Sequence, residues 1–359
     1  MDEFTQVGNQ AFESVLEQLR VNQARIEQLR NSPVLQPSTG SESMNTGIPA
    51  VPQADPRAAA PAAPAGTQPA VEEHAEPERS IEELLSELDD LIGLREVKGE
   101  IRRQTAVLHV QALRAEAGLK VPTITRHLVF VGNPGTGKTT VARLVAGIYK
   151  AVGLLSKGQL VEVDRSELVA GYLGQTATKT ADVVASALGG VLFIDEAYSL
   201  SGDQYGEESI NTLVKEMEDN RDDLVVIVAG YPAPMATFIA ENPGLASRFR
   251  TEIQFANYTD DELIKIFKQM VEKSDYDLGE EALEAFEFDL SRQIRDETFG
   301  NGRYCRNLLE AAIGHQAWRL RDTPAPTVEQ LRLLTREDIG GDSVIEPGDE
   351  LVTEPEETQ

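Results

Sequence analysis

The segment Gly132-Asn133-Pro134-Gly135-Thr136-Gly137-Lys138-Thr139 has the residue types and the spacing of a loop that wraps phosphate groups. Its glycines supply the backbone freedom that lets several N–H groups point inward at one anion. Lys138 would place a positive charge on the β- and γ-phosphates, and the hydroxyl of Thr139 would ligate Mg²⁺. The segment therefore predicts a binding site for a nucleoside triphosphate.

Two carboxylates, Asp195 and Glu196, follow the apolar segment 191–194, which reads as a buried strand. Asp195 would complete the Mg²⁺ shell with Thr139. Glu196 would orient and polarise the attacking water as a general base. The pair follows the phosphate-binding loop by the length of two β-α units, so the two motifs together predict hydrolysis of a triphosphate.

The elements that must position these groups form an α/β pattern. Residues 127–131 read as a strand before the loop, and residues 140–146 read as a helix whose N-terminal dipole faces the anion. Strands alternate with helices up to Phe255, which is typical of a parallel sheet covered on both faces. The five expected strands are 128–131, 160–163, 191–194, 224–229 and 252–255. From the cap at Thr259 onward the sequence reads as helical.

The chain divides into parts of different composition. We expect an amphipathic helix within residues 1–30, a disordered Pro/Ala-rich linker at 31–79, an α/β nucleotide-binding domain at 80–256, a smaller helical domain at 257–339 and a disordered acidic tail at 340–359. The first helix carries apolar residues at heptad spacing. It is either a docking or coiled-coil segment or a frayed amphipathic extension. Ser80 and Glu83 form a capping-box pattern where folding resumes.

Composition and charge exclude several functions. The net charge of −27 argues against nucleic acid as a partner, because phosphate backbones are bound by clustered Lys and Arg. Cys305 is the only cysteine, which excludes an intrachain disulfide and a multi-cysteine zinc site. No apolar run is long enough for membrane insertion, and the N-terminus lacks the order of a signal peptide. We therefore expect a cytoplasmic protein.

Several longer strings carry a family resemblance over about residues 80–340. They are "GNPGTGKTTVAR" (132–143), "YLGQTA" (172–177), "GGVLFIDEAYSL" (189–200), "NRDDLVVIVAGY" (220–231) and "NPGLASRF" (242–249). They resemble the AAA+ ATPases, and within them the group of red-type Rubisco activase, stage V sporulation protein K and the type VII secretion ATPases. The resemblance implies an AAA+ P-loop NTPase fold with an all-α lid domain, ATP and Mg²⁺ as cofactors, and a homo-oligomeric ring, usually a hexamer, that acts on a protein client.

The resemblance also assigns residues outside the two motifs. Tyr172, Leu173 and Gly174 match a pore loop that grips substrate in the central channel of the ring. Arg248 matches an arginine finger that reaches the γ-phosphate of the neighbouring subunit, with Arg250 as its rival.

In the string "GNGRYCRNLLEAA" (300–312), which resembles a sensor-2 helix, Arg303 would contact the nucleotide of its own subunit, with Arg306 as its rival. Ile92, Gly93 and Leu94 match a segment that lines the adenine pocket. The end of the fourth strand offers no Asn or Thr, so the sensor-1 position stays unassigned. With the loop, the expected nucleotide contacts are Gly132, Asn133, Pro134, Gly135, Thr136, Gly137, Lys138, Thr139, Thr140, Gly93, Leu94 and Arg303.

These inferences predict a ring motor that hydrolyses Mg·ATP and remodels or threads a protein client, in secretion or sporulation. One alternative is a red-type Rubisco activase. An alternative of another class is an ATP-dependent assembly scaffold or switch without mechanical output. The intact Glu196 argues against the scaffold, because a protein that only binds ATP has no need of a water-activating carboxylate.

Overall fold

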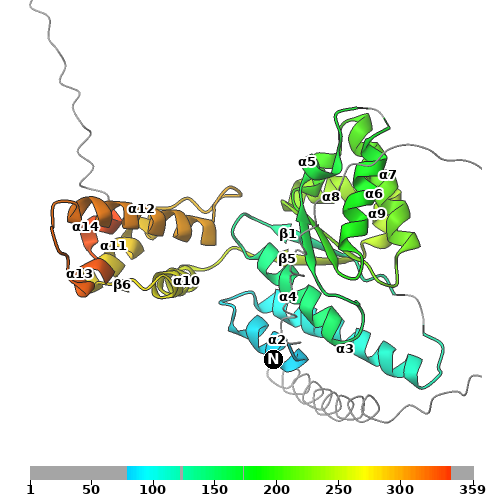
Figure 1. Ribbon diagram of the computed structural model, residues 1–359, viewed down its shortest axis with the longest axis horizontal. Coiled ribbons are helices and arrows are strands. Elements are labelled where there is room, and N and C mark those ends of the chain that lie inside the picture. The colour runs from blue at the N-terminus through cyan, green and yellow to red at the C-terminus, as the bar shows by residue number, and fades with distance from the viewer. Residues whose placement is uncertain (1–78, 122–123, 173, 341–359) are drawn as a thin grey trace, which may run out of the picture. The chain divides into compact units, whose positions relative to one another are not determined.

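The computed structural model describes residues 79–121, 124–172 and 174–340 (Figure 1). The predicted helix at 1–30, almost all of the linker at 31–79, nearly all of the tail at 340–359, and Leu173 lie outside these residues. The phosphate-binding loop, the acidic pair and all the predicted arginines lie inside them.

The first part of the described chain is an α/β unit. Its strands are β1 (Leu128–Gly132), β2 (Leu160–Val163), β3 (Val191–Ile194), β4 (Val225–Gly230) and β5 (Thr251–Phe255). Its helices are α2 (Ile81–Asp90), α3 (Arg95–Glu116), α4 (Lys138–Ala151), α5 (Arg165–Leu168), α6 (Thr176–Ala187), the 3-10 turn η1 (Ala197–Leu200), α7 (Gln204–Asp219), α8 (Pro232–Glu241) and α9 (Pro243–Arg248).

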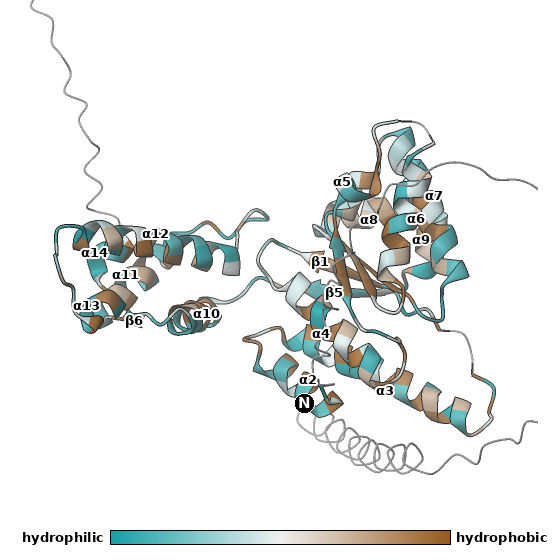
Figure 2. Cartoon of the chain, in the orientation of Figure 1, coloured by the Kyte–Doolittle hydropathy of each residue, from teal (hydrophilic) through white to brown (hydrophobic). Residues whose placement is uncertain are grey.

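All five strands run parallel in the order β2-β3-β4-β1-β5, which confirms the predicted parallel sheet. The observed strands differ from the predicted ones by at most one residue at either end. Strands β1, β3 and β4 are buried along their whole length, because helices cover both of their faces. They are the brown strands between the helices in Figure 2.

The two faces of the sheet pack against different helices. Alternate strand residues such as Val129, Leu192 and Val226 share one core with side chains of α6, α7 and α8. The sheet's other face includes Phe130, whose ring centroid lies 5.0 Å from that of Phe255. Because parallel strands all end at one edge, this packing brings the loop after β1 and the acids after β3 to the same edge.

The second part is helical, as predicted. It comprises α10 (Asp260–Lys273), α11 (Glu280–Ser291), α12 (Gly302–Leu320), α13 (Val328–Arg332) and α14 (Arg336–Gly340). Phe267 and Phe286 stack in its core with ring centroids 4.1 Å apart. The expectation of helix alone was incomplete, because β6 (Asp277–Leu278) and β7 (Leu333–Leu334) pair in parallel. Strands of two residues are too short to show an alternating pattern in the sequence.

Two of the four capping boxes in the described residues begin helices α2 and α10. Ser80 and Glu83 exchange hydrogen bonds with each other's backbone at the start of α2, as the sequence predicts. Thr259 and Glu262 do the same at the start of α10. The box at Thr259 fixes the beginning of the helical part immediately after the sheet.

Candidate nucleotide site

The loop between β1 and α4 is shaped by glycines at positive φ. Gly135 has φ 68° and Gly137, the N-cap of α4, has φ 94°, values that favour glycine. The Nζ of Lys138 donates hydrogen bonds to the carbonyls of Gly132 and Asn133 at 2.8 and 2.9 Å. Because an ammonium has three N–H donors, one remains for a further acceptor. Burial lowers the pKa of Lys138, while Asp195 acts in the opposite direction.

Not every residue of the predicted loop faces the cavity beside it. Asn133 turns its amide to the carboxamide oxygen of Asn257, at 2.9 Å, and to the carbonyl of Asp296. Thr136 is fully buried, and its hydroxyl donates to the carbonyl of Asn133 at 2.8 Å. These two side chains hold the loop in shape. The other predicted residues of the loop line the cavity: Gly132, Pro134, Gly135, Gly137, Lys138, Thr139 and Thr140.

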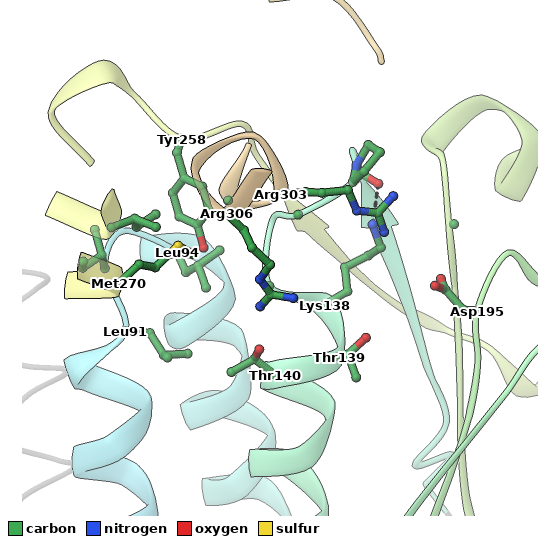
Figure 3. Close-up of a pocket in the computed structure, with 18 of the residues that line it drawn as sticks. Leu91, Leu94, Lys138, Thr139, Thr140, Asp195, Tyr258, Met270, Arg303 and Arg306 are labelled. Atoms are coloured by element: carbon green, nitrogen blue, oxygen red, sulfur yellow. Dashed lines mark hydrogen bonds between the residues drawn. The ribbon is translucent and has the colours of Figure 1, made fainter. Parts of the chain in front are cut away.

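The acidic pair lies across the cavity from the start of α4. Asp195 and Glu196 both line it, and Asp195 lies opposite Lys138 and Thr139 (Figure 3). Glu196 has φ 46°, a left-handed conformation that ends β3 abruptly, and its N–H donates to the carboxylate of Asp195 at 3.0 Å. The structure therefore brings together the four groups that the two motifs predict.

A third carboxylate reaches the same place. The hydroxyl of Thr139 donates to Glu162 of β2 at 3.2 Å. Sequence reasoning missed Glu162, because a lone acid within a short strand carries no motif. Glu162 could be placed only from the pairing of β2 with β3, which brings it to the same sheet edge as Asp195 and Glu196.

The cavity has a volume of about 400 Å³, within the range of small-molecule sites. One end is mostly apolar and includes Leu94, Tyr258 and Met270, while Asp195 lies at the other end (Figure 3). The predicted Leu94 thus lies at the end suited to a base. Gly93 does not line the cavity, and it has no room for a side chain, because a Cβ there would lie 2.6 Å from Glu262. Tyr258 and Met270, with Ile266 and Gln269, are lining residues that the sequence did not reveal.

Two arginines of α12 extend from the helical part into the cavity. Arg303 and Arg306 both line it and both point toward the phosphate-binding loop (Figure 3). Arg303 is near enough to Lys138 to lower its pKa further. Among the described residues neither guanidinium has a hydrogen bond or an ion pair, so both are available to an anion. The two rivals for the sensor-2 position therefore share the site.

The end of β4 carries an aromatic residue in place of a polar sensor. Ile194 of β3 pairs with Val228 of β4, so the next residues, Asp195 and Ala229, lie at the same sheet edge. Tyr231 follows and lines the cavity with Glu196. Burial, with Glu196 and Tyr231 nearby, raises the pKa of the neighbouring Tyr198 to about 12. No signal in the sequence alone pointed to Tyr231.

Arg248 does not line the nucleotide cavity. It ends α9 and forms an ion pair with Glu218 of α7 at 3.1 Å, and its guanidinium also donates to the carbonyl of Gly244. Its side chain is 21% exposed. Arg250 is exposed, and its Nε donates to the carbonyl of Ser247 at 3.3 Å. The two rivals for the finger thus differ in the contacts that hold their guanidinium groups: Arg248 has an ion pair and a main-chain hydrogen bond, and Arg250 has a main-chain hydrogen bond.

The predicted pore-loop tyrosine lies on the surface. Tyr172 is 73% exposed, in the segment between α5 and α6. Gly174 has φ 82°, and no atom would contact a Cβ added there. A second hollow runs from Gly171 to Asp195 and Glu196, so the acidic pair borders both the nucleotide cavity and this segment.

Cys305 is buried, and burial raises the pKa of its thiol to about 12, so it is a packed side chain and not a nucleophile.

The residues present fit a magnesium triphosphate. The glycines of the loop leave room for a backbone cradle, three cations line the cavity, and Thr139 and Asp195 supply oxygen ligands. No group of three or more His, Cys, Asp or Glu side chains within the described ranges could hold a metal ion. This also fits, since Mg²⁺ in such sites takes one or two protein ligands and completes its shell with phosphates and water.

Comparisons with known proteins agree with this geometry. The sequence model of the ATPase family associated with various cellular activities (AAA) matches residues 128–257, and that of the AAA lid domain matches residues 259–346. Stage V sporulation protein K of Bacillus subtilis is 44% identical over 67% of this chain and 76% of that protein. The chloroplastic ribulose bisphosphate carboxylase/oxygenase activase of Cyanidioschyzon merolae is 44% identical over 71% and 89%.

The ESX-1 secretion system protein EccA1 of Mycobacterium leprae is 41% identical over 77% of this chain but only 50% of that protein. Among solved structures, the FIGL-1 AAA domain in complex with ADP aligns with a TM-score of 0.52 at 19% identity, covering 70% of this chain and 81% of that one. That likeness concerns the fold. Within the described residues, no helix has the length and apolarity that crossing a membrane requires.

Proposed function

Because the chain belongs to the ATPase family associated with various cellular activities and is an ATPase that uses ATP and Mg²⁺, we propose that it is a ring-forming motor that remodels or threads a protein client. One observation carries the proposal. The phosphate-binding loop, the acidic pair and two arginines of the lid line a single cavity. A site built from two domains can convert the state of the phosphate into a change of lid position.

Each residue has a role in this proposal. The loop N–H groups and Lys138 bind the β- and γ-phosphates, and Arg303 or Arg306 contacts the γ-phosphate from the lid. Mg²⁺, when bound through Thr139 and Asp195, neutralises charge on these phosphates. Glu196 accepts the proton of the attacking water.

The neighbouring subunit would complete the site. Arg248 lies outside the cavity of its own subunit, so any contact it makes with a γ-phosphate is to that of a neighbour. We propose a homo-oligomeric ring, with six subunits as the expected number. Tyr172 would face the channel and contact the client through its exposed ring.

The identity of the client is the finer part of the proposal. Relatives named for sporulation and for Rubisco activation are equally similar to this chain, at 44% identity. We favour a role in secretion or sporulation, because the heptad pattern and the Pro/Ala-rich segment before residue 80 fit a targeting device. Red-type Rubisco activation is the second candidate. The cytoplasmic location and the absence of nucleic acid as a partner are predictions from composition.

Glu196→Gln tests the motor against the scaffold. The amide cannot accept the proton of water, so we expect ATP to bind while the turnover number falls by roughly 100-fold or more. Steady-state phosphate release and calorimetric titration with ATP measure the two effects. Glu207→Gln, an exposed change at the start of α7, serves as the matched control.

A Glu196→Gln variant with normal hydrolysis would remove this carboxylate from the mechanism and favour the scaffold. If hydrolysis stops as expected, the variant should remain loaded with ATP and retain its client. Affinity purification in ATP, compared with the same purification in ADP, would then identify that client.

A further inference from the structure

The turn that begins α12 contains a residue in a conformation that usually requires glycine. The N–H of Arg303 donates to the carbonyl of Gly300 at 2.8 Å, and Asn301 between them has φ 46° and ψ −122°. These are the angles of the first central position of a type II′ turn, where glycine is the usual residue. A side chain at this position costs backbone energy, so its contacts must compensate for the strain.

The side chain of Asn301 provides such contacts to three segments. It is fully buried, and its oxygen accepts a hydrogen bond from the N–H of Tyr258 at 3.0 Å, in the connection between the sheet and the lid. Its amide nitrogen lies 3.3 Å from the carbonyl of Pro134 in the phosphate-binding loop. The same nitrogen lies 2.9 Å from the Asn257 side chain and 3.0 Å from the carbonyl of Phe299.

Main-chain contacts hold the same two segments together. The N–H of Gly302 donates to the carbonyl of Gly135 at 3.0 Å. A Cβ added to Gly135 would lie 2.1 Å from the carbonyl oxygen of Gly300, and one added to Gly302 would lie 2.9 Å from the oxygen of Gly135. The phosphate-binding loop and the start of α12 therefore meet backbone to backbone, with no room for side chains.

We propose that Asn301 is a positioning residue that fixes the start of α12 against the phosphate-binding loop and thereby aims Arg303 and Arg306 at the γ-phosphate. The inference rests on the proposed function, because it takes the two arginines as phosphate ligands. Asn301 itself is buried and contacts main chain and Asn257, so it acts through these arginines.

The proposal makes Asn301 important for telling ATP from ADP. The two nucleotides differ by the γ-phosphate alone, so an arginine that is no longer aimed at this group reduces affinity for ATP more than for ADP. A hydrogen bond to a charged group corresponds to about a tenfold or greater change in affinity. A residue that serves only the stability of the fold would change both affinities alike.

The test is Asn301→Gly in the full chain with Mg²⁺. Glycine accepts the backbone angles of the turn, so this variant removes the side-chain hydrogen bonds without adding strain. Calorimetric titration with ADP and with the β,γ-imido analogue of ATP gives the ratio of the two affinities. We expect the preference for the triphosphate to fall about tenfold or more.

Asn307→Ala, on the exposed side of the same helix, is the matched control and should leave both affinities unchanged. A second variant, Gly302→Ala, disturbs the contact between the start of α12 and the phosphate-binding loop. Its methyl group would press on the carbonyl of Gly135, so the same loss of preference is expected. An unchanged preference in Asn301→Gly would overturn the inference, whatever the stability of the variant.

The Arg303→Gln/Arg306→Gln double variant separates the inference from the proposed function. If this variant keeps the full preference for the triphosphate, the proposed role of the arginines fails. If it loses the preference, adding Asn301→Gly should cause no further loss, because residues acting through one another are not additive. A further loss of equal size in the triple variant would show that Asn301 acts elsewhere and would overturn the inference.

Discussion

The guanidinium of Arg248 is partly occupied within its own subunit. Its ion pair with Glu218 and its hydrogen bond to Gly244 orient it at the end of α9, whereas Arg250 has one hydrogen bond to the main chain. An oriented guanidinium loses less conformational entropy when it meets a phosphate. We therefore favour Arg248 as the finger.

Arg248→Ala should reduce the turnover number of the assembled protein by about 100-fold or more, because such a finger neutralises charge in the transition state. Arg250→Ala is the matched control, and we expect it to reduce the turnover number by less than tenfold. Phosphate release at a protein concentration that sustains assembly measures both. The reverse ranking would assign the finger to Arg250.

A mixing experiment shows whether Arg248 acts on a neighbour. Arg248→Ala subunits retain Glu196, and Glu196→Gln subunits retain Arg248. A ring that mixes them contains sites with both groups intact, so we expect activity to recover in the mixture. Recovery would be absent if Arg248 served only its own subunit.

Individual residues also show what the sequence could and could not predict. Lys138, Thr139, Asp195 and Glu196 were predictable because each belongs to a local motif that follows a buried strand. Glu162 and Tyr231 were not, because the register of β2 with β3 and of β3 with β4 brings them to the site. Which of Arg248 and Arg250 is engaged by Glu218 depends on a contact with α7 that no local pattern encodes.

At the scale of elements, β1 and β4 are joined by a histidine as well as by their ladder. His127, just before β1, is 5% exposed, and its Nδ1 accepts a hydrogen bond from the N–H of Val226 at 3.0 Å. Burial, and then the positive charges of Arg248 and Arg126, lower its pKa from 6.5 to about 4. The fold therefore holds this imidazole neutral.

This shift predicts that the protein loses stability in mild acid. Between pH 6.5 and about 4 the unfolded chain binds a proton at His127 that the folded chain does not, so the free energy of unfolding falls as the pH falls. The loss from His127 should be about 2 kcal/mol by pH 5. Urea unfolding from pH 7.5 to 5 measures it.

His127→Asn keeps a hydrogen-bond acceptor but does not titrate. We expect this variant to be less stable than the natural protein near neutral pH, yet with a smaller dependence on pH. Equal slopes for the two proteins would show that other groups cause the acid sensitivity.

The elements themselves were largely predictable. Strands β1, β3 and β4 are continuous apolar runs because helices cover both of their faces, and runs of this kind are visible in the sequence. The β6–β7 pair was not predictable, because its two short segments lie far apart in the sequence and carry no alternation. The contact between Gly135 and Gly302 was not predictable either, because a glycine in a sequence does not indicate which segment packs against it.

At the scale of the whole molecule, the exposed Tyr172 links the ATPase to its proposed work. Its ring is 73% exposed, and the segment that bears it reaches the hollow that Asp195 and Glu196 border. A side chain that neither lines the nucleotide cavity nor packs in a core should be dispensable for hydrolysis itself.

Tyr172→Ala should therefore keep its basal ATPase activity within about twofold but lose remodelling of the client that Glu196→Gln retains. Tyr172→Phe keeps the aromatic ring and should retain remodelling. Basal phosphate release and loss of structure of the client, followed by proteolysis, are the two measurements. Remodelling by Tyr172→Ala at the normal rate would contradict the pore-loop assignment and favour the scaffold.

The position of β1 within the sheet has one more consequence. It is hydrogen-bonded to β4 on one side and to β5 on the other, so the loop that follows it is anchored to the interior of the sheet and not to its edge. A strand fixed on both sides cannot shift without disrupting two ladders at once. In the motor proposed above, we therefore expect the strand and loop that receive the nucleotide to stay in place, and displacement to occur in the chain beyond Phe255 and in the segment between α5 and α6.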